Sequence, residues 1–123
     1  FQKQQDSSMH KITPDVLYQA RSFASQNRQE ESVGILFDFG EITFYPVENK
    51  AKNKRDSFKL DPIYSLLSKR IYCIFHSHPH GDCYPSEEDL RSSRSSGLSL
   101  LVYSCIYDNF LFFDGEKCKQ IKE

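Results

Sequence analysis

The 123-residue sequence has no hydrophobic run long enough to cross a membrane and no large excess of charge of either sign. Its longest mostly apolar stretch, Leu98 to Tyr107, contains polar interruptions and is far shorter than the roughly 20 residues that a spanning helix needs. The 16 Lys and Arg residues nearly balance the 17 Asp and Glu residues, which gives no general attraction to phosphate backbones or anionic lipids. These absences argue against membrane and nucleic-acid partners.

A disulfide framework and a secretory signal are also missing. The four cysteines share no C-x-x-C spacing; they are Cys73, Cys83, Cys105 and Cys118. The N-terminal residues contain no apolar block, so we expect reduced thiols and a cytoplasmic protein. The first methionine is Met9, which favours the interpretation of residues 1–8 as an upstream extension or expression remnant and of residues 9–123 as a single domain.

Apolar content and local signals predict a mixed α/β fold. Hydrophobic residues make up 38% of the chain, with 10 Phe and 7 Tyr, which is enough for one packed core. Thr13 and Pro14 predict a helix over 14–26, with Val16, Ala20, Phe23 and Ala24 on one face. Apolar segments on either side of Gly40, over 33–39 and 41–47, predict a β-hairpin. Further expected elements are a cationic solvated loop over 48–56, a short strand over 58–60, a helix over 62–69, a strand over 71–76, a helix from Ser86 to Gly97, and strands over 98–103 and 110–113.

Two histidines at the end of a predicted strand are the clearest chemical signal. His76 and His78 are separated by one residue, so on a strand their side chains point to the same face. Asp89 lies in the first turn of the following helix and supplies a third potential ligand. Two imidazole nitrogens and one carboxylate suit Zn²⁺ with a fourth position open for water, as in catalytic sites. Ser86 and Asp89 also fit a helix capping box, a purely structural alternative.

These residues form a pattern that resembles a known family. His76-Ser77-His78-Pro79, followed by six residues, Ser86, two residues and Asp89, matches the H-x-H-P-x(6)-S-x(2)-D signature of the JAMM (MPN+, JAB) zinc metalloproteases. The upstream Glu31-Ser-Val-Gly34 is similar to the E-x-x-G segment of that family, and the resemblance extends from about Val16 to Phe113. Asn49, Phe58 and Asp61-Pro62 are similar to the small prokaryotic and phage-type members.

The resemblance implies a fold and a division of roles. The fold would be the MPN/JAB (cytidine-deaminase-like) fold, a curved mixed β-sheet flanked by helices. His76, His78 and Asp89 would be the zinc ligands, Glu31 the general acid/base and Ser86 the support for the oxyanion. The implied activity is a deubiquitinase-like metallo-(iso)peptidase that cleaves the amide bond after the C-terminus of ubiquitin or a ubiquitin-like protein, with no nucleic-acid or membrane partner. By spacing alone, Glu30 and Glu31 are equally good candidates for the general acid/base, and the similarity to the E-x-x-G segment favours Glu31.

Other interpretations of the same residues remain open. A non-catalytic MPN scaffold would bind zinc without cleaving any ubiquitin-like fusion. A RadC-like domain shares the pattern from His76 to Asp89, but RadC-like proteins tend to have an Asp-His pair in the next strand, where this chain has Leu100 to Ser104. His80 is expected to be exposed or beside the ligands. Cys83 is expected to be an inert loop cysteine, with a regulatory thiol as the alternative.

Overall fold

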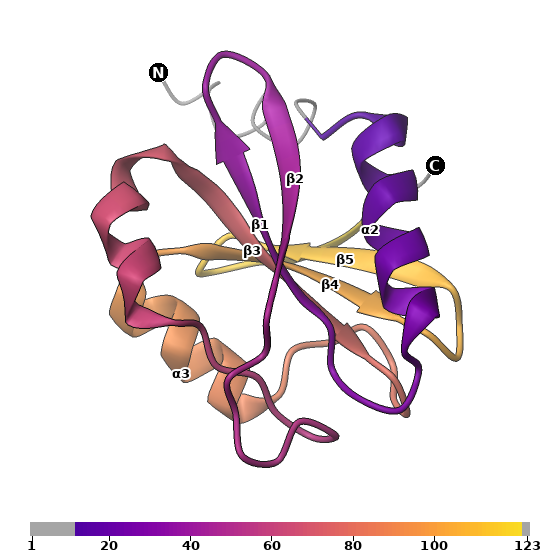
Figure 1. The fold of residues 1–123 in the computed structure, drawn as a ribbon. Helices are drawn as coiled ribbons and strands as arrows, with labels where there is room; N and C mark the ends of the chain where they lie inside the picture. The colour runs from indigo at the N-terminus through magenta and orange to yellow at the C-terminus, as the bar shows by residue number, and fades with distance from the viewer. Residues whose placement is uncertain (1–11, 122–123) are drawn as a thin grey trace.

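A computed structural model describes residues 12–121, and its centre is a six-stranded sheet with helices on both faces (Figure 1). The strand order is β2-β1-β3-β4-β5-β6, and β3 pairs with β4 in parallel while the other neighbours are antiparallel. The elements in chain order are α2 (Pro14–Gln26), β1 (Val33–Asp38), β2 (Ile42–Val47), the 3-10 helix η1 (Pro62–Arg70), β3 (Ile71–His78), α3 (Glu87–Ser96), β4 (Ser99–Ser104), β5 (Asn109–Phe113) and β6 (Cys118–Ile121). The expected mixed α/β sheet is confirmed. None of the helices in the described residues combines the length and apolar character needed to span a bilayer.

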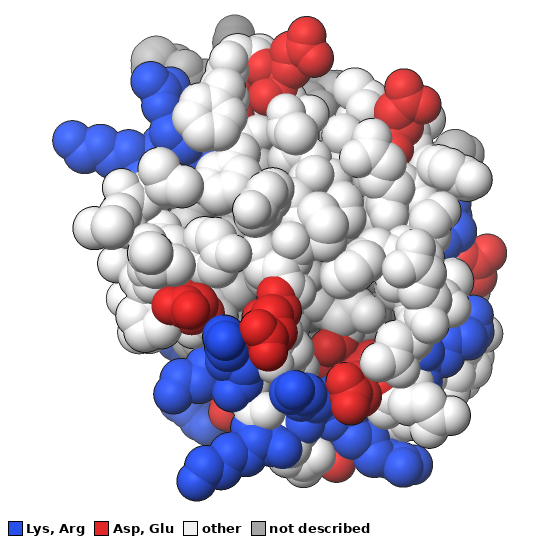
Figure 2. All heavy atoms as spheres, in the orientation of Figure 1, with Lys and Arg blue, Asp and Glu red and all other residues white. Residues whose placement is uncertain are grey.

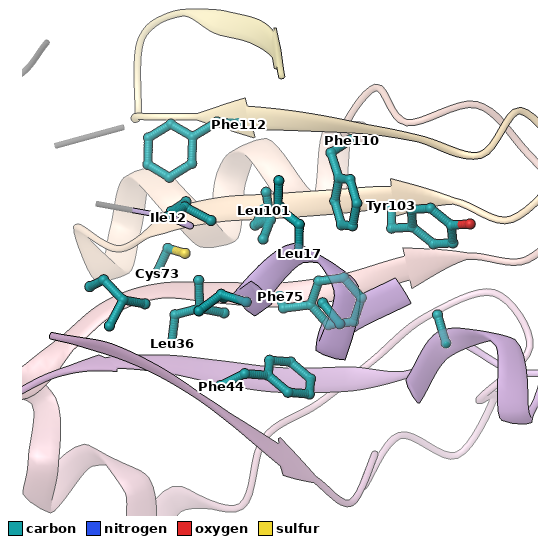
Figure 3. Close-up of a cluster of buried hydrophobic side chains, with 14 of the residues drawn as sticks. Ile12, Leu17, Leu36, Phe44, Cys73, Phe75, Leu101, Tyr103, Phe110 and Phe112 are labelled. Carbon is teal, nitrogen blue, oxygen red and sulfur yellow. The ribbon is translucent and has the colours of Figure 1, made fainter. Parts of the chain in front are cut away.

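The capping signal fixes the position of α2. The Thr13 side chain accepts a hydrogen bond from the Val16 amide, and Pro14 occupies the first turn, as the sequence predicts. The buried face of α2 consists of Val16, Leu17, Ala20 and Ala24. This face packs on one side of the sheet, in a cluster to which Phe44, Phe75 and Leu101 also belong (Figure 3). The α2 helix therefore covers one face of the sheet.

The opposite face of the sheet carries a second hydrophobic cluster. Ile35, Ile74 and Val102 come from neighbouring strands, while Leu90 of α3 and Tyr64 of η1 pack against them. A chain that returns to form a parallel strand must cross over the sheet, and α3 is the crossover between β3 and β4. The N-terminus of α3 is therefore reached by the loop that leaves the carboxyl end of β3. Gly97 ends α3 in the left-handed conformation, at φ 74°.

Charged side chains gather at one end of the molecule. Figure 2 shows most of the Lys and Arg side chains of this face at the lower end of the view, with acidic side chains among them, a mostly uncharged surface across the middle, and a few charged side chains at the upper edge. The loop between β2 and η1 lies at this end and contains four basic residues between Lys50 and Arg55 (Figure 1). Most of the loop is exposed, as expected for a cationic segment, but Asn49 at its start is buried.

The structure differs from the sequence-based expectation in three places. Residues 58–60 do not form a strand, because the Lys59 amide donates to the Asn49 side chain and the Phe58 ring stacks on His76. The helix expected over 62–69 is present as a 3-10 helix over 62–70, with non-helical angles at Leu67 and no fully buried residue. The edge strand β6 was not expected, because its mostly exposed sequence Cys-Lys-Gln-Ile has no alternation of apolar and polar residues.

Gly34 is the one glycine whose missing side chain makes room for the core. A Cβ at this position would lie 2.5 Å from Cε1 of Phe44, whose ring also contacts the Phe75 ring edge-on at a centroid distance of 5.6 Å. We expect Gly34→Ala to destabilise the protein by about 1–3 kcal/mol through overpacking, measured by urea unfolding. Gly81→Ala is the matched control, because a Cβ there meets nothing within 4 Å, and it should leave stability nearly unchanged. Equal stability of the two variants would contradict this account of Gly34.

Candidate metal centre

Two histidines at the carboxyl end of β3 meet one carboxylate. His76 is fully buried and His78 is mostly buried, and both Nε2 atoms face the same oxygen of Asp89. The His76 Nε2–Asp89 Oδ2 distance is 3.1 Å, and the His78 Nε2–Asp89 Oδ2 distance is 3.3 Å. The i, i+2 spacing on a strand thus places both imidazoles on the α3 side of the sheet, as the sequence predicts.

Asp89 belongs to the helix cap and to this cluster at the same time. Its Oδ2 accepts a hydrogen bond from the Ser86 amide at 2.9 Å, while its own amide donates to Ser86 Oγ at 3.1 Å. This is the reciprocal capping box that the sequence offered as a structural alternative. The two interpretations are compatible, because the cap holds the carboxylate in front of the histidines.

Burial and hydrogen bonds together shift the pKa values of His76, His78 and Asp89. Burial lowers the pKa of His76. Burial also opposes the charged form of His78, but the bonds to Asp89 and to the Asp82 carbonyl outweigh it and raise the pKa of His78. Although burial would raise the pKa of Asp89, the two imidazoles and the Ser86 amide hold it far below its ordinary value. The carboxylate is therefore ionised at neutral pH.

The donor set fits a divalent cation. His78 Nδ1 lies 2.7 Å from the Asp82 carbonyl, which can only accept, so Nδ1 carries a proton and Nε2 is the nitrogen left to act as a ligand. A tetrahedral Zn²⁺ with ligand bonds of about 2.0–2.1 Å would place its ligand atoms roughly 3.3–3.4 Å apart. The 3.1 and 3.3 Å separations around Asp89 Oδ2 are close to that edge length. Two of the three ligand separations in the His76, His78 and Asp89 set are thus compatible with a bound zinc ion.

Glu31 lies beside the two histidines. Ligand atoms of Glu31, His76 and His78 are all within 4.8 Å of one another, and Glu31 is only 7% exposed. Its Oε1 atom is buried without a hydrogen-bond partner among the described residues. Burial raises the pKa of Glu31 to about 8, in spite of the opposing effect of His78. Such a carboxyl can act as an acid/base or as a further ligand.

The neighbouring Glu30 differs from Glu31 in its surroundings. Glu30 is partly exposed, and its Oε1 accepts a hydrogen bond from the Asn27 side chain at 3.5 Å. By spacing alone, Glu30 and Glu31 were equally good candidates for the general acid/base. Of the two, Glu31 belongs to the described group of side chains with His76 and His78.

Ser86 is exposed at the start of α3. Its hydroxyl oxygen accepts the Asp89 amide, which uses one lone pair and leaves the O–H free to donate elsewhere. The capping role and a role toward substrate therefore do not compete for the same part of the hydroxyl group.

Several supporting residues had no clear signal in the sequence. Ser77 Oγ accepts a hydrogen bond from the Ser32 amide at 2.8 Å, which ties the segment that carries Glu31 to β3. The Phe58 ring stacks on His76 with centroids 4.4 Å apart. Ser77 lies between His76 and His78 on β3, so its side chain points to the opposite face of the sheet from the two imidazoles.

Other residues singled out by the sequence lie outside the cluster. His80 is exposed. Cys83 is 1% exposed and packs in the cluster with Val102 and Leu111, and burial raises the pKa of its thiol, so the inert alternative is favoured. Cys73 is fully buried in the other hydrophobic cluster, where burial raises the pKa of its thiol.

The sequence model of a family described as prokaryotic homologs of the JAB domain matches residues 13–114. The chain belongs to this family. The curated proteins include no match to this JAB-domain protein.

Solved structures similar to this JAB-domain protein share its architecture. Protein DSY2949 from Desulfitobacterium hafniense is 22% identical with a TM-score of 0.66, over 89% of this chain and 88% of that chain. AF2198, a JAB1/MPN domain protein from Archaeoglobus fulgidus, is 20% identical with a TM-score of 0.55, over 86% and 89%. A structure described as a JAMM metalloprotease-like zinc site in the proteasome and signalosome is 19% identical with a TM-score of 0.52, over 87% of each chain. The expected MPN/JAB fold is confirmed.

The substitution Asp89→Asn distinguishes the capping role of Asp89 from its role as a metal ligand. The amide oxygen of Asn can still accept the Ser86 amide, whereas the anionic ligand is lost. We expect zinc affinity to fall by at least about 100-fold, measured by competition with a chromophoric chelator. Glu88→Gln is the control, because it removes the preceding acid of the same helical turn and should keep the parent affinity. Parent-like zinc binding by Asp89→Asn would remove Asp89 from the ligand set.

Proposed function

We propose that this JAB-domain protein is a zinc-dependent peptidase or isopeptidase. The observation that carries the proposal is the convergence of His76, His78 and Asp89 beside the buried, unpartnered Oε1 of Glu31. A cluster that only braced a loop would not require a buried carboxyl oxygen that receives no hydrogen bond from the described residues. The match to the JAB family supports the same class of chemistry.

His76, His78 and Asp89 would hold the zinc ion. When bound, zinc would lower the pKa of a water molecule to about 7 and polarise the carbonyl of the scissile amide. The buried imidazoles and the Phe58 ring stacked on His76 exclude bulk water from one side of the site. The bond from His78 Nδ1 to the Asp82 carbonyl orients that ring toward Asp89.

Glu31 would take a proton from the attacking water and return it to the leaving amine. A general acid/base works best when its pKa lies near the working pH, and burial already moves the pKa of Glu31 into that range. Ser86 would donate its hydroxyl hydrogen to the oxyanion of the tetrahedral intermediate. A well-placed donor of this kind stabilises the transition state by roughly 3 kcal/mol.

We propose ubiquitin or a ubiquitin-like protein as the substrate, cleaved after its C-terminus. A flexible C-terminal tail can bind in extended form along a sheet edge, where main-chain pairing positions the scissile bond. The outer side of β2 pairs with no strand among the described residues, and β2 is the neighbour of β1, which begins two residues after Glu31.

Glu31→Gln tests the acid/base role. We expect zinc content to stay at the parent level while kcat on ubiquitin-like C-terminal fusions falls by about 100-fold to 10,000-fold, because the amide cannot accept the proton. Metal analysis and a cleavage panel of such fusions provide the two measurements. Glu30→Gln is the matched control and should cleave like the parent.

Each other result of this experiment has a defined meaning. Full activity of Glu31→Gln would exclude Glu31 from the reaction. Bound zinc in a parent protein that cleaves no fusion would favour the non-catalytic scaffold and contradict the proposed function.

Ser86→Ala and Ser86→Thr together test the oxyanion role. Alanine removes both the cap and the hydroxyl donor, so we expect a loss of about 1 kcal/mol in stability and a decrease of about 100-fold in kcat. Threonine keeps both functions and should retain most of the activity. Zinc content should match the parent in both variants. A kcat for Ser86→Ala within twofold of the parent would limit Ser86 to capping α3.

A further inference from the structure

One buried side chain joins Glu31 to both ends of the loop between β2 and η1. Asn49 lies two residues after the end of β2 and is 8% exposed. Its Nδ2 donates to the Glu31 carbonyl and to the Ser57 carbonyl, each at 3.0 Å. Its Oδ1 accepts from the amides of Ala51 and Lys59, each at 3.0 Å. An asparagine side chain has two N–H donors and two acceptor lone pairs, so Asn49 uses its full capacity.

The same loop holds Glu31 a second time. The Glu31 amide donates to the Lys54 carbonyl at 2.6 Å, so both backbone polar groups of Glu31 are bonded to the segment from Asn49 to Lys54. On the other side, Ser32 exchanges two hydrogen bonds with Ser77 of β3. Glu31 is therefore held between the strand that carries the histidines and the loop that Asn49 organises.

This backbone support matters because the carboxyl group of Glu31 has little support of its own. Glu31 precedes β1, so no strand ladder fixes its backbone. Its Oε1 has no hydrogen-bond partner among the residues that the structure describes. The orientation of the carboxyl group beside His76 and His78 consequently depends on the position of the backbone.

We propose that Asn49 is a positioning residue for Glu31. Its side chain fixes the Glu31 backbone and thereby holds the Glu31 carboxyl beside the two histidines. Asn49 touches no reacting group, so its effect passes entirely through Glu31. The consequence for catalysis rests on the proposed function, whereas the effect on the position of Glu31 can be measured without any substrate.

A double-mutant cycle tests whether Asn49 acts through Glu31. We expect Asn49→Ala to lower kcat by about 10-fold to 100-fold with KM and zinc content near the parent values, because misplacement by about 1 Å can cost that much. In the Glu31→Gln background the same change should lower kcat by less than about twofold, because residues that act as a unit are not additive. An equal effect of Asn49→Ala in both backgrounds, or no effect in either, would overturn the proposal.

Two further variants separate positioning from loss of structure. Asn53→Ala is the matched control, since Asn53 lies in the same loop and its exposed side chain donates to Asp56. It should leave kcat unchanged. Asn49→Asp keeps the acceptors for Ala51 and Lys59 but loses both donors, so it should reproduce the loss of kcat even if Asn49→Ala unfolds the loop.

Amide hydrogen exchange gives the readout that needs no substrate. The Glu31 amide, bonded to the Lys54 carbonyl, should exchange faster in Asn49→Ala and Asn49→Asp than in the parent and should be unchanged in Asn53→Ala. Unchanged exchange at Glu31 in both Asn49 variants would overturn the positioning role. If the parent cleaves no fusion, the proposed function fails separately, and faster exchange at Glu31 would still support the positioning role.

Discussion

The parallel pairing of β3 with β4 is the constraint on which the candidate metal centre depends. Parallel neighbours cannot be joined by a tight turn, so the chain must cross over the sheet, and α3 forms that crossover. The loop from the carboxyl end of β3 then leads directly to the N-terminus of α3. His76 and His78 end the strand, and Asp89 lies in the first helical turn, so the topology itself brings the three side chains together. A helix N-terminus also favours a negative group, which stabilises the Asp89 carboxylate.

The site reuses groups that the fold already needs. Ser86 and Asp89 satisfy backbone donors at the start of α3, and the same Asp89 oxygen faces both imidazoles. Ser77 alternates with the histidines along β3 and bonds to Ser32 on the neighbouring segment. Cap, strand pairing and ligand placement are thus one connected set of hydrogen bonds. Such sharing reduces the number of side chains that must be ordered for function alone.

The sequence predicted those parts of the structure that depend on local chemistry. Thr13 and Pro14 located α2 to the residue, and the spacing of His76, His78 and Asp89 identified the side chains that meet. The features that the sequence did not predict depend on contacts between distant segments of the chain. Phe58 is not part of a strand, and its ring stacks on His76. The strand β6 pairs with the edge of β5, although the β6 sequence has no alternation of apolar and polar residues. The bonds from Asn49 to Glu31 join residues 18 positions apart, so no local pattern could indicate them.

The buried carboxyl group of Glu31 is unfavourable for the stability of the fold. A carboxyl group that is 7% exposed, with one oxygen unpartnered, opposes folding unless it stays protonated, and its pKa of about 8 reflects that cost. The surrounding backbone compensates, because the Glu31 amide and carbonyl are both bonded and Ser32 is bonded to Ser77. Both main-chain polar groups of Glu31 are thus bonded, whereas Oε1 of its side chain has no partner among the described residues. Departures of this kind concentrate at functional sites, where the unsatisfied group is the one that acts on a ligand. The same reasoning explains why Asn49 is buried in an otherwise exposed loop: fixing an unsupported carboxyl requires a polar side chain that can bond the backbone on both sides.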